Sequence, residues 1–162
     1  MSAFVVDVNV PIVANGRSPQ ADGDCVVACV DKLSEVQASG ILVLDDGMRI
    51  LSEYMSNLSM SGQPGLGDFF MRWVWENQAV DARCERVPLT PANSDQDDFE
   101  EFPDDPDLNA FDPSDRKYVA VALASRLKPE VLNAVDPDWW DYRLALETSG
   151  VTVNFLCPQC MG

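Results

Sequence analysis

Short apolar runs alternate with stretches of helical periodicity along most of this chain. Strands are predicted at residues 3–8, 41–44, 84–89, 131–135 and 151–156. Helices are predicted between them, at residues 22–39, 48–60, 68–79, 114–127 and 139–148. Strands that alternate with helices are typical of βαβ units and a parallel sheet. Because the crossovers are right-handed, the pattern predicts an α/β fold, a three-layer α/β/α sandwich around a central parallel sheet.

The size and composition indicate one folded domain over residues 1–162. The chain has 162 residues and an apolar fraction of 46%, which is enough to bury a substantial core. No apolar stretch approaches the roughly 20 residues that cross a bilayer, so no membrane contact is expected. Met1–Phe4 has no positive start before an apolar signal region, and a cytoplasmic protein is therefore expected.

The five cysteines do not form the pattern of a disulfide framework, since their number is odd. Cys25 and Cys29 are one helical turn apart, and Cys157 and Cys160 have CxxC spacing. Four thiolates could bind zinc. The favoured interpretation is that Cys25 and Cys29 are small core residues of a helix, and that Cys157 and Cys160 form a loose C-terminal pair.

The net charge of −16 argues against nucleic acid, because phosphate binding usually draws on a basic surface. Much of this charge lies in one acidic segment, residues 91–112, which is predicted to be a loop or insertion. Residues 95–107 contain eight acids and no Lys or Arg, and leaving them out reduces the net charge to −8. The acidic segment could be only a solvated surface, or it could bind a basic partner.

Four acids lie at element boundaries that should face one end of the sheet. Asp7 ends the first strand and is followed by Asn9, and Asp136 ends the strand 131–135. Asp115 lies in the first turn of helix 114–127, and Glu53 lies off the apolar stripe of helix 48–60. Clustered carboxylates repel one another unless a cation lies between them. Such oxygen ligands suit Mg²⁺ or Mn²⁺, which can activate water for attack on a phosphodiester.

In this order, the motifs resemble those of the PIN-domain family of metal-dependent ribonucleases. Residues 5–9, Val-Val-Asp-Val-Asn, look like the opening hDxN motif, and Glu53 is similar to the helical acid of that family. Residues 112–122 resemble the third motif, and residues 133–140 the fourth, in which an acid pair precedes an aromatic residue. The resemblance covers about residues 3–156. It implies a sheet of about five strands in the order 3-2-1-4-5.

The resemblance also implies an activity, the cleavage of single-stranded RNA, often by the toxin of a toxin–antitoxin pair. By matching position, the implied metal ligands or catalytic acids are Asp7, Glu53, Asp115, Asp136 and Asp138. Asn9 would orient Asp7 or a water at the metal. An antitoxin or another basic protein is an implied partner, and a homodimer is expected by resemblance only. This chain departs from the family in its length, its acidity and its acidic segment.

Several of these residues have a structural interpretation as well. Arg116 and Lys117 could hold a phosphate or pair with neighbouring acids. Trp139 and Trp140 could stack on a base, but one or both are expected in the core. Asp112 is expected to be a capping residue, and Asp45 and Asp46 to form a turn. Residues 63–67 could bind a phosphate, although a plain loop is favoured.

Two other functions stay open at this point. The same fold could be a protein-binding module with weak or no catalysis, whose acidic surface binds a basic regulator. The same carboxylates could also serve a metal-dependent DNA nuclease or phosphatase.

Overall fold

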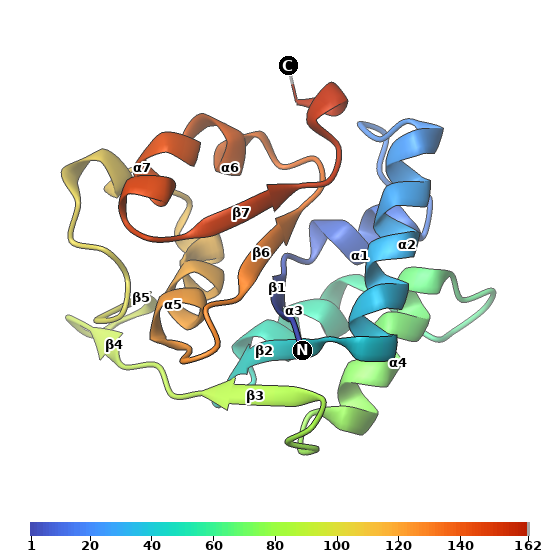
Figure 1. Ribbon diagram of the computed structural model, residues 1–162, viewed down its shortest axis with the longest axis horizontal. Helices are drawn as coiled ribbons and strands as arrows, with labels where there is room; N and C mark the ends of the chain where they lie inside the picture. Colours follow the sequence, from blue (N-terminus) through green and yellow to red (C-terminus); the bar gives the residue numbers. More distant parts are fainter. Residues whose placement is uncertain (162) are drawn as a thin grey trace.

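The computed structural model describes residues 1–161, apart from the side chains of residues 95 and 96. It contains a five-stranded sheet in the order β3-β2-β1-β6-β7, and all neighbouring strands are parallel (Figure 1). The strands are β1 (Ala3–Val6), β2 (Ile41–Asp45), β3 (Cys84–Val87), β6 (Glu130–Asn133) and β7 (Thr152–Phe155). The predicted α/β architecture and its parallel sheet are confirmed.

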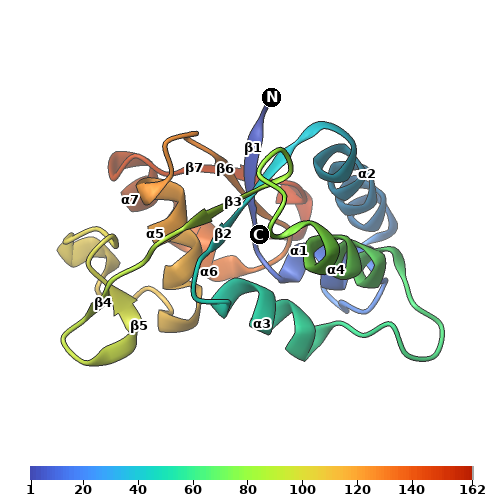
Figure 2. The same ribbon diagram turned by 90° about the horizontal axis from the view of Figure 1, so that it is seen from below.

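Helices cover both faces of this sheet and complete the three layers (Figure 2). They are α1 (Asn9–Ala14), α2 (Gly23–Ser39), α3 (Arg49–Asn57), α4 (Leu66–Asn77), α5 (Arg116–Ala124), α6 (Pro137–Asp141) and α7 (Arg143–Thr148). Helices α1, α2 and α4 pack together on one side, and α5 and α7 lie on the other. Within the described residues, no helix combines the length and the apolar character that a bilayer crossing requires.

Strand β1 lies at the centre of the sheet and carries the first candidate acid at its end. Phe4 is paired with Leu42 of β2, and Val5 with Val131 of β6. All four residues of β1 are buried. Burial on both faces explains why this strand reads as a continuous apolar run rather than an alternating one.

Three helical predictions differ from the structure. Helix α1 was not predicted, because a proline such as Pro11 usually interrupts a helix. Pro11 lies in the first turn of this short helix, where a proline is tolerated. The helix predicted at 139–148 is two short helices that meet at Tyr142. The helix predicted at 114–127 is α5, preceded by the 3-10 turn Pro113–Asp115. Asp112, rather than Ser114, caps this turn by accepting a hydrogen bond from the Ser114 N–H at 3.0 Å.

The acidic segment is more ordered than a loop. It contains the antiparallel hairpin of β4 (Pro91–Ala92) and β5 (Asp95–Phe99), followed by the 3-10 turn Pro106–Leu108. Phe99, Leu108 and Phe111 are buried and anchor the segment to the core. The prediction of an unpacked insertion is therefore wrong, because the segment supplies apolar anchors between its acids.

Arg116 ties the acidic segment to helix α5. Its guanidinium donates hydrogen bonds to the carbonyls of Asn109 and Phe111, and to Asp98 Oδ1 at 3.3 Å. The guanidinium also lies over the ring of Phe102, 4.8 Å from its centre. The half-buried Arg116 thus donates to several acceptors of a segment that has no Lys or Arg between residues 95 and 107.

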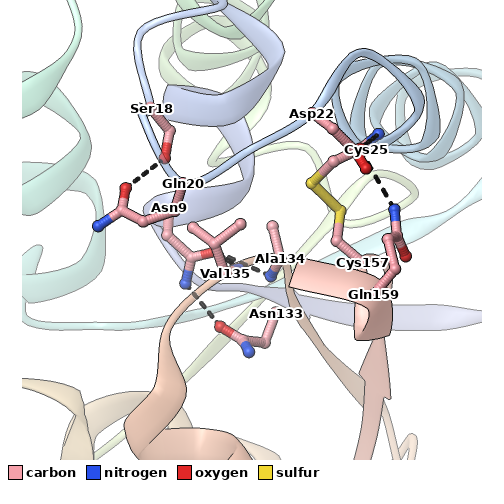
Figure 3. Close-up of a disulfide and its surroundings, with 10 residues drawn as sticks. All are labelled: Asn9, Ser18, Gln20, Asp22, Cys25, Asn133, Ala134, Val135, Cys157 and Gln159. Carbon is pink, nitrogen blue, oxygen red and sulfur yellow. Dashed lines mark hydrogen bonds between the residues drawn. A yellow bond between two sulfur atoms is a disulfide. The ribbon is translucent and has the colours of Figure 1, made fainter. Parts of the chain in front are cut away.

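Cys25 and Cys157 form a disulfide that joins helix α2 to the C-terminal turn (Figure 3). The interpretation of Cys157 as half of a loose C-terminal pair is therefore wrong. Spacing could not reveal this bond, because its partners are 132 residues apart in sequence. Cys29 is a free buried thiol, as expected for the core face of a helix, and Cys84 is another.

Candidate metal centre

Asp7 follows the central strand and is buried, with 2% of its surface exposed. Its Oδ1 accepts hydrogen bonds from the backbone N–H of Asn9 at 2.9 Å and from the Asn9 side-chain amide at 2.7 Å. Its Oδ2 accepts from the indole N–H of Trp139 at 3.0 Å. These three donors fix the orientation of the carboxylate and leave one lone pair, on Oδ2, that can bind a cation.

Asp115 and Asp136 come to the same place from other elements. Asp115 ends the 3-10 turn before α5, and Asp136 caps helix α6 by accepting from the Asp138 N–H at 3.0 Å. One carboxylate oxygen from each of Asp7, Asp115 and Asp136 lies within 4.8 Å of the other two. Three of the four predicted acids are therefore brought together at the carboxyl edge of the sheet, as the strand-end pattern indicated.

The electrostatics of this cluster favour a bound cation. Burial, together with the charges of Asp136 and Glu53, raises the pKa of Asp7 from 3.8 to about 7. Burial and the charges of Asp7 and Asp136 raise the pKa of Asp115 to about 9. Among residues 1–161, no Lys or Arg forms an ion pair with Asp7, Asp115 or Asp136. Positive charge must therefore come from outside the chain if all three carboxylates are to ionise.

Asn9 connects the ends of strands β1 and β6 (Figure 3). Its side-chain amide donates to Asn133 Oδ1 at 2.7 Å, and its carbonyl oxygen accepts from the N–H groups of Ala134 and Val135. Its hydrogen bonds to Asp7 agree with the predicted orienting role. Asn133 is fully buried and was not predicted as a site residue, because the strand predicted at 131–135 placed it in mid-strand, whereas β6 ends at Asn133.

Trp139 has both a core role and a polar one. It is fully buried, as expected, and packs edge-on against Phe111 with ring centres 5.2 Å apart. Its hydrogen bond to Asp7 was not foreseen. Trp140 is half-buried and packs edge-on against Phe155, so neither ring is free on both faces.

Asp138 belongs to a second, overlapping group of acids. Its Oδ2 accepts from the Asp112 N–H at 3.2 Å. Oxygens of Asp112, Asp115 and Asp138 also lie within 4.8 Å of one another. Asp112 is therefore a capping residue, as expected, and also a neighbour of the cluster. Because Asp115 is shared, a second cation or a network of waters would join the two groups at this residue.

Glu53 does not belong to the close group of three aspartates. Its Oε2 accepts from Lys117 Nζ at 3.1 Å, and its Oε1 accepts from the Tyr118 hydroxyl. Lys117 is itself largely buried and also donates to the Ser114 carbonyl. The charge of Glu53 still acts on the cluster, since it raises the pKa of Asp7. Lys117 thus pairs with an acid, which is one of the two roles considered for it.

A cavity of about 250 Å³ opens beside Glu53 and Lys117. It is lined by Arg49, Glu53, Asp97, Phe99, Pro113, Ser114 and Lys117. The three clustered aspartates are not among its lining residues. Arg49 and Lys117 bring two cationic groups to it, whereas Arg116 is directed to the acidic segment.

Two other predicted positions have structural roles. Asp45 is buried and accepts from the N–H groups of Arg49 and Ile50, so it caps α3 in addition to forming the turn. Residues 63–67 lead into helix α4, where Asp68 accepts from the N–H of Gly65 at 2.8 Å. An acid therefore already occupies this helix N-terminus.

Comparisons of the chain with protein-family models, with curated proteins and with solved structures give no match. The PIN-domain resemblance therefore rests on the motifs of this chain, and the function has to be argued from the site itself.

Proposed function

We propose that this protein is a metal-dependent endoribonuclease that cleaves phosphodiester bonds of single-stranded RNA. The observation that carries the proposal is the meeting of Asp7, Asp115 and Asp136 within 4.8 Å, from three separate elements, with Asp7 and Asp115 buried and Asp136 half-buried. An isolated acid at a strand end is common. Two buried acids beside a half-buried third, with the pKa of Asp7 and of Asp115 raised by burial and by neighbouring carboxylates, are costly for the fold and call for a functional reason.

The donor set fits a hard divalent cation. All the groups offered are carboxylate oxygens, which Mg²⁺ and Mn²⁺ prefer, and Asp138 could add a further ligand. When bound, such a cation supplies an activated water and a counter-charge for the phosphate. The chain offers no His and no thiol at this place, so a softer metal is not favoured.

The remaining residues prepare the site for a phosphate. Asn9 and Trp139 hold Asp7 in place through hydrogen bonds. Lys117 neutralises Glu53, which lowers the negative charge that an approaching phosphate meets. Arg49 lines the same cavity as Lys117 and, although it pairs with Asp45 at 3.5 Å, is a candidate for contact with a phosphate that enters there.

The choice of RNA rests on the PIN-domain resemblance. The sheet order β3-β2-β1-β6-β7 is the order that this resemblance implies, which supports the proposal. The net charge of −16 opposes any nucleic-acid substrate, and a bound cation offsets part of it at the site. If the protein is a toxin, we expect its antitoxin to bind over the acidic segment.

The test is a cleavage assay with labelled single-stranded RNA and single-stranded DNA, with Mn²⁺ or with excess chelator. We expect RNA to be cleaved only with Mn²⁺, and Asp7→Asn or Asp136→Asn to abolish the cleavage. Asp31→Asn is the matched control, because Asp31 is an exposed acid of helix α2. Cleavage that persists with chelator or in Asp7→Asn would refute the mechanism. Cleavage of DNA alone would show that the substrate is DNA rather than RNA.

A second candidate function is favoured by the acidic segment. Its hairpin and its buried aromatic residues present a fixed acidic surface beside the site. A basic protein is the partner that such a surface would bind. Salt-sensitive binding of a basic protein, with no cleavage of RNA under any metal condition, would favour this binding module over the nuclease.

A further inference from the structure

Four of the five cysteines lie together, away from the aspartate cluster. Cys25 and Cys29 are one turn apart on helix α2, Cys157 immediately precedes the C-terminal 3-10 turn Pro158–Cys160, and Cys160 ends it. The sulfur atoms of Cys25, Cys29 and Cys157 lie within 4.8 Å of one another. Cys160 is close enough for its charge to act on Cys29. The fifth cysteine, Cys84, lies on strand β3.

We propose that these four cysteines form a zinc site in the reduced chain, and that the Cys25–Cys157 disulfide is the oxidised, metal-free state of the same site. The spacings C-x₃-C and C-x₂-C both fall within the range of structural zinc sites. Residues four apart on a helix project from the same face. Helix α2 therefore directs two sulfurs toward the turn that carries the other two.

The surroundings suit thiolates bound to a metal. Cys25, Cys29 and Cys157 are fully buried. Four soft sulfur ligands would select Zn²⁺ over Mg²⁺, whereas the aspartates do the reverse. The two sites would therefore hold different metals.

The turn has a contact that does not depend on sulfur. Gln159 Nε2 donates to Asp22 Oδ1 at 3.3 Å, and the same oxygen caps helix α2 by accepting from the Cys25 N–H at 2.8 Å (Figure 3). This contact keeps the C-terminal turn beside the start of α2 when the disulfide is open. A reducing compartment would keep the thiols free, which is the state that can take up zinc.

The change between the two states is a two-electron step. The disulfide forms from two thiols by exchange with a small-molecule disulfide, which takes up the two electrons and two protons and leaves as two thiols. A phosphine reverses it: water supplies the oxygen of the phosphine oxide and both thiol protons. When the metal binds, the four thiols of the reduced site lose their protons.

The experiment uses the full chain, reduced with a water-soluble phosphine and titrated with Co²⁺ in the absence of oxygen. Thiolate ligands give Co²⁺ a charge-transfer absorption that carboxylates do not give. We expect this absorption to saturate at one equivalent and to disappear when one equivalent of Zn²⁺ is added. Cys29→Ser and Cys160→Ser should weaken Co²⁺ binding by about tenfold or more. Cys84→Ser is the matched control and should leave the titration unchanged.

Two results would overturn the zinc site. One is the lack of a charge-transfer absorption in the reduced wild-type protein. The other is a Co²⁺ titration that stays unchanged in Cys160→Ser. Cys160 is only half-buried, so this variant is expected to fold, and its circular dichroism spectrum should match that of the wild type. It decides the question even if Cys29→Ser, at a fully buried position, does not fold.

Discussion

The indole N–H of Trp139 donates a hydrogen bond to Asp7 across 3.0 Å, and this bond joins the end of the central strand to helix α6. The two residues are 132 positions apart in sequence. Both are buried, so the bond is formed in a medium of low dielectric, where a charge-assisted hydrogen bond is strong. Asp7 is thus held by a donor that would not move when a cation binds.

Trp139→Phe should weaken the site while keeping most of the core packing. The variant keeps an aromatic ring but removes the donor to Asp7, so we expect Mn²⁺ affinity to fall by about 10- to 100-fold. Calorimetric titration with Mn²⁺ measures this loss. Trp140→Phe is the control, because Trp140 packs on Phe155 and forms no hydrogen bond to Asp7. Equal Mn²⁺ affinities in the two variants would contradict the role given to the indole.

The stability of the metal-free protein should fall as the pH rises. The pKa of Asp7 is about 7 and that of Asp115 about 9 in the folded chain, against 3.8 for an ordinary aspartate. Between these values the folded state holds protons that the unfolded state has lost, so the free energy of unfolding decreases from about pH 4 through pH 9. Thermal unfolding in chelator between pH 5 and pH 9 measures the decrease.

Two additions sharpen the pH experiment. Asp115→Asn should flatten the dependence, because the substituted side chain needs no proton to stay neutral. Mn²⁺ should raise the unfolding midpoint more at pH 8 than at pH 5, since it binds the ionised carboxylates. A stability that rises with pH in chelator would show that the carboxylates are not coupled as described.

Glu53 and Lys117 should depend on each other for stability. Their side chains are 23% and 11% exposed and lie 3.1 Å apart. Removing one partner leaves a partly buried charge unpaired, so Glu53→Gln or Lys117→Met should each cost about 2 kcal/mol, between the values for surface and buried pairs. Urea unfolding of the single and double variants gives the coupling energy. Strictly additive losses would mean that the pair contributes nothing of its own.

Arg116→Gln should loosen the acidic segment without removing any acid of the cluster. The substitution removes the cation that binds the carbonyls of Asn109 and Phe111. We expect faster cleavage by a glutamate-specific protease after Glu100 or Glu101, measured by mass spectrometry of the fragments. Arg72→Gln is the control, because Arg72 forms an exposed pair with Glu76. Equal cleavage rates in both variants would indicate that Arg116 does not hold the segment.

The sequence was most informative where local pattern and sheet geometry act together. Parallel strands bring their carboxyl ends to one edge, so Asp7 and Asp136 could be placed together from strand ends alone. Asp115 could be assigned to the same site because it was predicted to lie in the first turn of a helix. Asn133 was not accessible to this reasoning, because the predicted strand continued to residue 135 whereas β6 ends at Asn133, whose buried amide bridges to Asn9.

The sequence was least informative about contacts between distant side chains. The position of Glu53 off the apolar stripe is consistent with a role at the site, but nothing local revealed that Lys117, 64 residues later, pairs with it. The hairpin of the acidic segment was missed because Asp95, Asp97 and Asp98 are poor strand formers that are paired here by a tight turn. The disulfide could not be predicted from the spacing of the cysteines either, because Cys25 and Cys157 are 132 residues apart in sequence.

The Cys25–Cys157 bond divides the oxidised molecule into a covalent ring and an N-terminal arm of 24 residues. The ring contains β2, β3, β6 and β7, and the arm contains β1, which lies between two strands of the ring. The middle strand is therefore joined to the ring at one end only, and Asp7 lies on this arm rather than in the ring. Assembly of the three aspartates in that form amounts to inserting one short arm into an already closed loop.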